Sequence, residues 1–378
     1  MRIGLICPYN YFRPGGVQVC IGSIAEELKK RGHYVRIIAP KPKIIPSVVP
    51  KELILVGNST EFNTPFATKA DLGMSGSVNK IDELLKEHNF DVLHFHEPGL
   101  PLLSAQILSR SKSVNIGTMH ATLPEGMVSK SFERLMQPYA KLIEPKLHFV
   151  TAVSETAKET ALTYSPKTKV EIVPNGIDID VFKTKTKTRS EKDSKTKTIL
   201  YIGRLEKRKG VRYLIKAYAE LVKDHKNIKL VIAGDGNLRK GLENLVEKYE
   251  LKNVKFVGFI SEKQKIKYLQ TADLFVSPAL YGESFGIVLL EAMSAGTVVV
   301  AGNNPGYQSV MTGRGRLSLV DSKSRTDFAQ RMELMLFDYE IRNLWLKWAN
   351  NYIKQFDYSL ITDKYEKIYK DTIKKYKA

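Results

Sequence analysis

Two glutamates in one glycine-flanked run have the types and spacing to bind a sugar and its phosphates. Glu283 and Glu291 stand eight residues apart in GESFGIVLLEAM, which runs from Gly282 to Met293. On one helix they would lie about 12 Å apart along its axis. If the helix begins near Phe285, however, Glu283 lies in the preceding loop and both carboxylates can face one ligand, while the first N–H groups of the helix face its phosphates. One carboxylate can then accept hydrogen bonds from sugar hydroxyls and the other from a ribose.

A basic turn could supply the cations that a diphosphate needs. The run GRLEKRKG, from Gly203 to Gly210, follows a short apolar segment that predicts a strand. A planar guanidinium fork and a compact ammonium charge are complementary ways to hold phosphate oxygens. Arg204 and Lys209 are the candidate diphosphate ligands.

A second glycine-containing turn follows the first apolar segment of the chain. It reads CPYNYFRPGGVQ over residues 7–18, and glycines at such a turn let backbone N–H groups approach a phosphate or a sugar. It is not GxGxxG, so a nicotinamide or flavin dinucleotide fold is poorly supported. His120 ends a predicted strand on the ligand side and is a candidate substrate contact, whereas His94 and His96 alternate along one strand and share a face.

Metal chemistry has little support in the sequence. The two cysteines, Cys7 and Cys20, are too few for a disulfide framework and are interpreted as small buried apolar residues in a reducing compartment. The acidic pair Asp178 and Asp180 follows a Pro-Asn-Gly turn, where metal binding is not expected. No Walker A run, GxSxG elbow or paired CxxC occurs. We therefore expect neither a metal nor a cofactor.

Short β-branched segments alternate with amphipathic ones along nearly the whole chain, which predicts parallel sheets covered by helices and an α/β fold. Strands are expected at Ile3–Pro8, Val35–Pro40, Val92–Phe95, Asn115–Met119, Phe149–Ala152, Glu171–Pro174, Ile199–Gly203, Leu230–Ala233, Val254–Gly258, Leu274–Ser277 and Thr297–Ala301. Helices are expected at Val17–Arg31, Val78–His88, Leu102–Arg110, Phe132–Glu144, Glu155–Tyr164, Val211–Lys223, Leu238–Tyr249, Glu262–Gln270, Gly286–Ala295, Thr326–Leu336 and Tyr358–Lys377.

The length of the chain and the distribution of its charge predict two domains and an anionic partner. The 378 residues carry a net charge of +19 with a pI near 9.6, which indicates an anionic partner. Residues 1–182 hold 21 basic and 18 acidic residues, whereas 183–378 hold 38 and 22. The segment 183–198 has no apolar residue, so we expect a solvated loop between domains 1–182 and 199–356. No 18-residue apolar run exists, and we expect a soluble cytoplasmic protein.

Taken together, five runs resemble the retaining family 4 glycosyltransferases of the GT-B fold, most closely the phosphatidyl-myo-inositol mannosyltransferases. They cover nearly the whole chain in order: PGGVQ at Pro14–Gln18, DVLHFHEP at Asp91–Pro98, VPNGID at Val173–Asp178, GRLEKRKG at Gly203–Gly210 and GESFGIVLLEAMSAGTVVVA at Gly282–Ala301. The resemblance implies two Rossmann-like domains facing across a cleft, with residues 357–378 returning to the N-terminal domain. It also implies transfer of a hexose, mannose or glucose, from GDP-sugar or UDP-sugar to a lipid or cell-envelope acceptor.

The same resemblance assigns roles to residues by matching positions. Donor-binding residues would be Gly16, Arg204, Lys209, Glu283, Ser284, Phe285, Gly286, Ile287 and Glu291; acceptor-binding residues would be Tyr9, Gln18 and His120. His120, Glu283, Arg204 and Lys209 would act at the reacting centre, where retention without a clear protein nucleophile asks for positioning and charge stabilisation. A metal is then unnecessary.

The resemblance also places the protein on the inner face of the cytoplasmic membrane, where an anionic surface suits the positive charge. The helix at 77–88, with two lysines and three acidic residues, leaves phosphatidylinositol open as the acceptor. Two other activities stay open: a relative acting as a nucleotide-sugar epimerase or phosphorylase, and a non-enzymatic binder of anionic polymers. Nucleic acid is disfavoured, because the sequence has no RNP-like motif, recognition-helix module or zinc spacing. The sequence does not indicate an oligomeric state.

Overall fold

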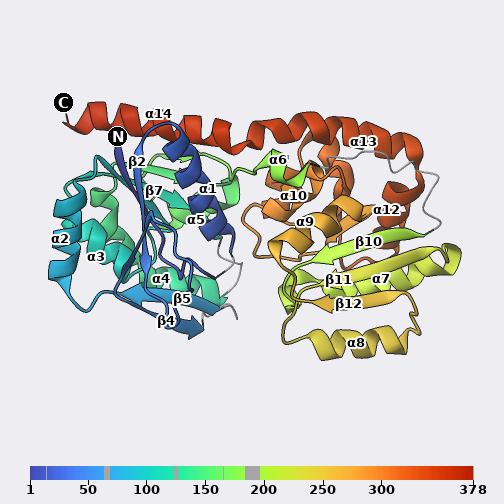
Figure 1. The fold of residues 1–378 in the computed structure, drawn as a ribbon. Coiled ribbons are helices and arrows are strands. Elements are labelled where there is room, and N and C mark those ends of the chain that lie inside the picture. The colour runs from blue at the N-terminus through green and yellow to red at the C-terminus, as the bar shows by residue number, and fades with distance from the viewer. Residues whose placement is uncertain (14, 64–68, 123–126, 165, 184–195, 378) are drawn as a thin grey trace. The chain divides into compact units, whose positions relative to one another are not determined.

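The computed structural model describes every residue except 14, 64–68, 123–126, 165, 184–195 and 378, and it separates into two compact units (Figure 1). The first unit comprises Met1–Gly176 and Tyr358–Ala378, and the second comprises Ile177–Asp357. Each has its own parallel sheet with helices on both faces.

The first unit is built on a seven-stranded sheet in the order β3-β2-β1-β6-β7-β8-β9. Its strands are β1 (Arg2–Ile6), β2 (Tyr34–Pro40), β3 (Leu53–Val56), β6 (Val92–His96), β7 (Val114–Met119), β8 (Phe149–Ala152) and β9 (Val170–Ile172). Every neighbouring pair is parallel. The chain moves from β1 to β2 on one side and later places β6 on the other, so the strand order reverses between β1 and β6.

Alternate side chains of these strands pack into two hydrophobic cores, one on each face of the sheet. On one face, Ile3 and Leu5 of β1 pack with α1 (Gly16–Lys30) and α14 (Tyr358–Lys377). On the other, Ile6 packs with α2 (Val78–His88), α3 (Leu103–Arg110) and the end of α4 (Met127–Ile143). Period-two alternation thus makes the sheet apolar on both faces, as a covered parallel sheet requires.

The remaining elements of this unit are local additions. They are α5 (Glu155–Tyr164), the 3₁₀ turn Glu144–Lys146 and an antiparallel hairpin of β4 (Asn58–Asn63) and β5 (Lys69–Met74). The sequence patterns predicted neither β3 nor the hairpin, and the hairpin strands lack a continuous apolar run. They also placed the start of α4 at Phe132, five residues after its observed start at Met127.

The second unit repeats the architecture with a six-stranded parallel sheet in the order β12-β11-β10-β13-β14-β15. Its strands are β10 (Lys197–Ile202), β11 (Ile228–Ala233), β12 (Val254–Gly258), β13 (Leu274–Ser277), β14 (Val298–Gly302) and β15 (Leu319–Val320). The order reverses between β10 and β13. Two doubly wound parallel sheets therefore confirm the predicted fold class.

Helices cover both faces of the second sheet. Those of this unit are α6 (Ile179–Phe182), α7 (Val211–Asp224), α8 (Arg239–Lys248), α9 (Glu262–Thr271), α10 (Ile287–Ser294), α11 (Pro305–Val310), α12 (Arg325–Phe337) and α13 (Tyr339–Tyr352), with 3₁₀ turns at Lys207–Lys209, Gly313–Ser318 and Ile353–Phe356. α7 packs against α8 and α12, whereas α10 packs against α6, α9 and α13. The right-handed crossovers through α7 and through α10 run in opposite directions along the sheet, so these two helices lie on opposite faces of it. The long helix α13 was missed by the sequence analysis.

The observed boundaries differ from the expected 182 and 357. Residues 177–182 belong to the second unit because α6 packs against α9 and α10 there. The chain returns to the first unit at Tyr358 rather than at 357, since the backbone N–H of Ile177 donates to the carbonyl of Phe356 and holds both ends of the second unit together. Most of the basic loop 183–198 lies outside the described residues; β10 begins within it, at Lys197.

None of the helices in the described part of the chain combines the length and the apolar character needed to cross a membrane.

Candidate active site

The second unit brings its two candidate loops together. β10 and β13 pair at the point where the strand order reverses, which is where open parallel sheets bind ligands outside the carboxyl ends of their strands. Residues 203–210 follow β10 and residues 278–286 follow β13. The two loops are joined by a hydrogen bond in which the N–H of Leu280 donates to the carbonyl of Arg208 at 2.8 Å. The candidate donor residues on these two loops therefore lie at the switch point of this unit.

Two glycines allow this close approach. Gly210 has φ +70°, and a Cβ there would lie 2.1 Å from the carbonyl oxygen of Pro278. Gly286 has φ +96° and immediately precedes α10, where a Cβ would lie 2.6 Å from the ring of Tyr307. A side chain would clash at both positions, and glycine adopts this backbone conformation without strain. The N-terminus of α10, with N–H groups that lack intrahelical acceptors, is thereby held at the edge of the site.

Glu283 is a partly buried carboxylate shared by two cations. Its Oε1 lies 2.7 Å from Nη1 of Arg208 and 2.8 Å from Nζ of Lys209, and the three side chains are 13%, 15% and 17% exposed. Burial alone would raise the pKa of Glu283, but the charges of Lys209 and Arg208 outweigh it and hold the pKa below its usual value. The carboxylate is therefore ionised at neutral pH, with two cations fixed beside it.

The structure distinguishes between the two predicted cations. Lys209, a predicted diphosphate ligand, reaches the carboxylate of Glu283. Arg204 is half-exposed and its Nη1 pairs with Oε1 of Glu206 at 2.9 Å. The arginine at Glu283 is Arg208, which the sequence analysis missed, because the 3₁₀ turn Lys207–Lys209 decides which members of a run of three basic residues face the carboxylate.

Glu291 has a different cation partner. It lies on α10, is buried, and its Oε1 is 2.7 Å from Nζ of Lys265 on α9. Lys265 also pairs with the exposed Glu262 at 2.8 Å. Burial raises the pKa of Glu291 and the charge of Lys265 only partly opposes that effect. No sequence motif pointed to Lys265.

The residues between the two glutamates form the turn into α10. Ser284 and Ile287 are partly buried. Phe285 is 3% exposed and packs its ring edge-on against Phe356, with centroids 5.9 Å apart. A ligand at this turn would therefore meet the backbone of Phe285 rather than its ring.

The predicted acceptor residues follow strands of the first unit, Tyr9 and His120 in loops and Gln18 at the start of α1. Tyr9 follows β1, and burial raises the pKa of its hydroxyl well above the usual value. Nε2 of Gln18, on α1, donates to the carbonyl of Asn10 at 3.2 Å. At Gly16 a Cβ would meet nothing within 4 Å, so the backbone there is open to approach.

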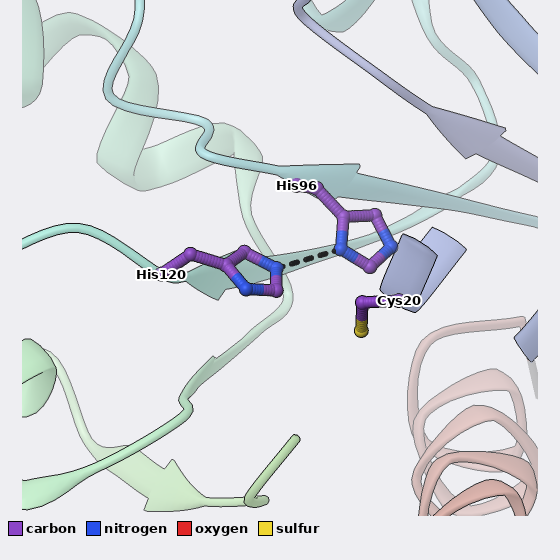
Figure 2. A group of neighbouring side chains, drawn as sticks. All are labelled: Cys20, His96 and His120. Atoms are coloured by element: carbon purple, nitrogen blue, oxygen red, sulfur yellow. Dashed lines mark hydrogen bonds between the residues drawn. The ribbon is translucent and has the colours of Figure 1, made fainter. Parts of the chain in front are cut away.

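His120 belongs to a buried polar group (Figure 2). Its Nε2 is 2.8 Å from Nδ1 of His96, the last residue of β6. The carboxylate of Glu97, which has φ +55°, accepts the backbone N–H groups of His120 and Ala121. Burial lowers the pKa of His120 to about 3, and burial raises the pKa of Glu97 to about 7 against the opposing effect of those two N–H donors. His120 is thus a neutral imidazole whose backbone is fixed by Glu97, a residue that sequence reasoning did not single out.

His94 and His96 share a face as predicted, with ring centroids 4.3 Å apart, but their surroundings differ. His94 is bonded at both nitrogens, to the hydroxyl of Tyr369 at 2.7 Å and to that of Thr118 at 2.6 Å. Its role is to join α14 to β7 inside the core.

Comparison with known proteins gives matches over nearly the full length. Residues 14–181 match the family described as Glycosyltransferase Family 4, and residues 182–352 match Glycosyl transferases group 1. The chain is 30% identical over 379 residues to a phosphatidyl-myo-inositol mannosyltransferase of Mycobacterium tuberculosis, covering 98% of this chain and 96% of the relative. It is 27% identical over 321 residues to an alpha-monoglucosyldiacylglycerol synthase of Streptococcus pneumoniae, covering 81% and 72%.

Solved structures share the fold at lower identity. The crystal structure of Anabaena HepE in complex with UDP superposes with a TM-score of 0.76 at 18% identity, covering 98% of this chain and all (100%) of the other. At that identity the likeness concerns the arrangement of helices and strands alone.

Proposed function

The chain belongs to the glycosyltransferases that join a family 4 domain to a group 1 domain, and we propose that it is a retaining hexosyltransferase with a nucleotide-sugar donor and a lipid or cell-envelope acceptor. The hexose would be mannose or glucose, carried by GDP or UDP. The acceptor class is suggested by the two relatives, whose names refer to phosphatidyl-myo-inositol and to glucosyldiacylglycerol.

The cluster of Glu283, Arg208 and Lys209 at the start of α10 carries this proposal. It combines two fixed cations, a partly buried ionised carboxylate and the N–H groups of a helix N-terminus at one strand edge. A sugar diphosphate presents the complementary groups, since its phosphates are anionic and its sugar hydroxyls donate hydrogen bonds.

We assign the donor diphosphate to Lys209, Arg208 and the N-terminus of α10. The leaving diphosphate gains negative charge as the glycosidic bond breaks, and preorganised cations stabilise that charge more than they stabilise the ground state. In this assignment the phosphates share the cations that now pair with Glu283. The carboxylate of Glu283 then accepts hydrogen bonds from the sugar hydroxyls and faces the flattened, positive sugar.

The other donor contacts follow from position. Glu291 binds the ribose and shares Lys265 while doing so. Ser284, Phe285, Gly286 and Ile287 line the phosphate and base region through their backbone. Arg204, now paired with Glu206, and Gly16 contribute to the diphosphate as the resemblance implies.

On the acceptor side we assign the attacking hydroxyl to the surroundings of His120, Tyr9 and Gln18. A neutral imidazole can accept or donate one hydrogen bond without adding positive charge beside a cationic sugar. Retention then rests on holding the acceptor on the face that the diphosphate leaves, with no covalent intermediate on the protein. No metal or cofactor is part of this scheme.

We further propose that the protein works peripherally at the cytoplasmic face of the membrane. Residues 183–378 hold 38 basic and 22 acidic residues, and basic residues that reach an anionic surface contribute roughly 1 kcal/mol each. Vesicle flotation should show binding to anionic vesicles that weakens as salt is added. Equal partitioning onto neutral and anionic vesicles would contradict the electrostatic mechanism.

A donor screen with matched variants tests the site. Thermal shift with GDP- and UDP-sugars is measured for wild type, for Lys209→Ala and for Lys207→Ala, which removes an exposed cation from the same turn. A donor at 100 times its Kd stabilises by about 2.7 kcal/mol, so wild type and Lys207→Ala should shift and Lys209→Ala should not. Full transfer by a Glu283→Gln, Lys209→Ala double variant would contradict the site. A free epimer formed from the donor, with no acceptor modified, would contradict transfer.

A further inference from the structure

Three potential metal ligands converge inside the first unit. Cys20 of α1, His96 at the end of β6 and His120 just after β7 offer ligand atoms that all lie within 4.8 Å of one another (Figure 2). All three side chains are buried, with exposures of 1%, 0% and 5%. From the sequence, Cys20 was interpreted as a small buried apolar residue, and it lies 76 residues before His96 in the chain. The packing of α1 against the sheet brings them together.

His96 is incompletely bonded in this group. Its Nδ1 makes the hydrogen bond to His120, but its Nε2 is buried and has no hydrogen-bond partner among the described residues. An unsatisfied buried polar atom costs about 1–3 kcal/mol. The neighbouring His94 shows what a structural histidine in this core looks like, since both of its nitrogens are bonded. His96 has a ligating atom that the protein itself leaves unused.

The protonation states suit a soft cation. Burial lowers the pKa of His96 far below its usual value and that of His120 to about 3, so both imidazoles keep a lone pair at neutral pH. Burial raises the pKa of Cys20 to about 12, so without a metal the thiol keeps its proton. A thiophilic ion displaces such a proton on binding, and one proton is released for each ion bound.

We propose that Cys20, His96 and His120 form a binding site for one thiophilic d¹⁰ metal ion, copper(I) or zinc(II). The sulfur loses its proton and forms a metal–thiolate bond, while the imidazoles bind as neutral ligands and no electron is transferred. A copper(I) ion with one thiolate is electrically neutral, which suits a buried site. Zinc(II) would leave one positive charge and needs a fourth ligand such as hydroxide.

The geometry requires a small adjustment. Two nitrogens bound to one ion at about 2.0 Å stand roughly 3.3–3.5 Å apart, whereas Nδ1 of His96 and Nε2 of His120 are 2.8 Å apart. The rings must therefore separate by about half an ångström, which replaces the hydrogen bond between them by two metal bonds. Alternatively His96 turns Nε2 toward the ion and satisfies its unpartnered atom.

Binding has a consequence for transfer that rests on the proposed function. An ion bound to His120 removes that imidazole from the acceptor and adds bulk beside it. Copper(I) or zinc(II) should therefore inhibit transfer, and the inhibition should depend on Cys20, a residue with no assigned role in catalysis.

Metal titration of the full chain tests the site. Copper(I) is presented from its bicinchoninate complex under anaerobic conditions, and zinc(II) in competition with a chromophoric chelator. We compare wild type, Cys20→Ala, the near-isosteric Cys20→Ser and the control Cys7→Ala. Cys7 is equally buried and burial raises its thiol pKa to about 12, but it donates to the carbonyl of Tyr9 and is not one of the three clustered ligands.

Wild type and Cys7→Ala should bind one ion with sub-micromolar Kd, release one proton and show a thiolate-to-metal absorption band with copper. Both Cys20 variants should bind at least about 100-fold more weakly. The proposal is overturned if either folded Cys20 variant binds like wild type, if Cys7→Ala loses as much affinity, or if wild type binds neither ion below micromolar concentration. If the ion binds as described but transfer is unaffected, the site stands and the placement of His120 beside the acceptor is contradicted.

Discussion

The turn that supports the Glu283 loop offers a geometric test of the site. Gly306 lies at the start of α11, and a Cβ there would lie 1.9 Å from the carbonyl oxygen of Glu283. Real Cβ atoms essentially never come within 3.0 Å of such an atom. The neighbouring Asn304 is buried and its Nδ2 donates to the carbonyl of Ala279 at 2.9 Å. The loop cannot move away from Gly306 without straining this second attachment.

In Gly306→Ala the backbone at Glu283 must move by about 1.1 Å to reach that limit. Overpacking of this kind costs about 1–3 kcal/mol, which for a unit of this size lowers Tm by roughly 2–12 °C. A displacement of about 1 Å at a reacting centre costs about 100-fold in rate. We therefore expect kcat/KM for transfer to fall about 100-fold while most of the protein remains folded at 25 °C.

The matched control is Gly241→Ala. Gly241 is exposed on α8 and a Cβ there would meet nothing within 4 Å. Alanine should stabilise this helix by about 0.5–1 kcal/mol and leave transfer unchanged. Thermal unfolding and steady-state transfer are measured for both variants. A Gly306→Ala protein with wild-type Tm and wild-type kcat/KM would refute the claim that this turn positions Glu283.

Three further changes should have separate readouts. Gly16→Ala has room for its methyl group, so Tm should hold while donor Kd rises about tenfold or more, about 1.4 kcal/mol; unchanged donor titrations would remove Gly16 from the donor site. Tyr369→Phe leaves Nδ1 of His94 without its partner and should cost about 1–3 kcal/mol in urea unfolding, so an unchanged midpoint would contradict that account. Folding raises the pKa of Glu97 from 4.5 to about 7. Between pH 4.5 and about pH 7, the folded chain therefore holds a proton on Glu97 that the unfolded chain has released. Stability should fall by up to about 3 kcal/mol as pH rises through that window and change no further above it, and Glu97→Gln should flatten this slope; parallel pH profiles would show that Glu97 does not titrate there.

Much of the fold could be predicted from the sequence because its strands are short, continuous and β-branched. Every residue of the strands Val298–Gly302 and Leu274–Ser277 is buried. These strands could therefore be predicted without an alternating pattern of apolar and polar residues. The hairpin β4–β5 was missed because it lies outside the main sheet and its six-residue strand Asn58–Asn63 is largely polar. Helix α13 was also missed, although it buries Trp345 and Ala349.

The position of the candidate site could be predicted from its glycines, but the partners of its charged side chains could not. Gly286 signals the tight turn into α10, and both Glu283 and Lys209, each singled out from the sequence, lie at this turn as one ion pair. Sequence could not distinguish Arg208 from Arg204, because the 3₁₀ turn Lys207–Lys209 sets the direction of the Arg208 side chain. Nor could it bring Cys20 to His96, because that contact depends on how a helix packs across a sheet.

Product analysis tests the central claim most directly. Wild-type protein is incubated with an α-linked GDP- or UDP-hexose and phospholipid vesicles, and the anomeric configuration of the lipid product is determined by NMR. We predict an α-linked glycolipid formed together with one nucleoside diphosphate per transfer, and its absence from the Glu283→Gln, Lys209→Ala double variant. A β-linked product would contradict retention, and a double variant that forms the product at the wild-type rate would contradict the site built around Glu283.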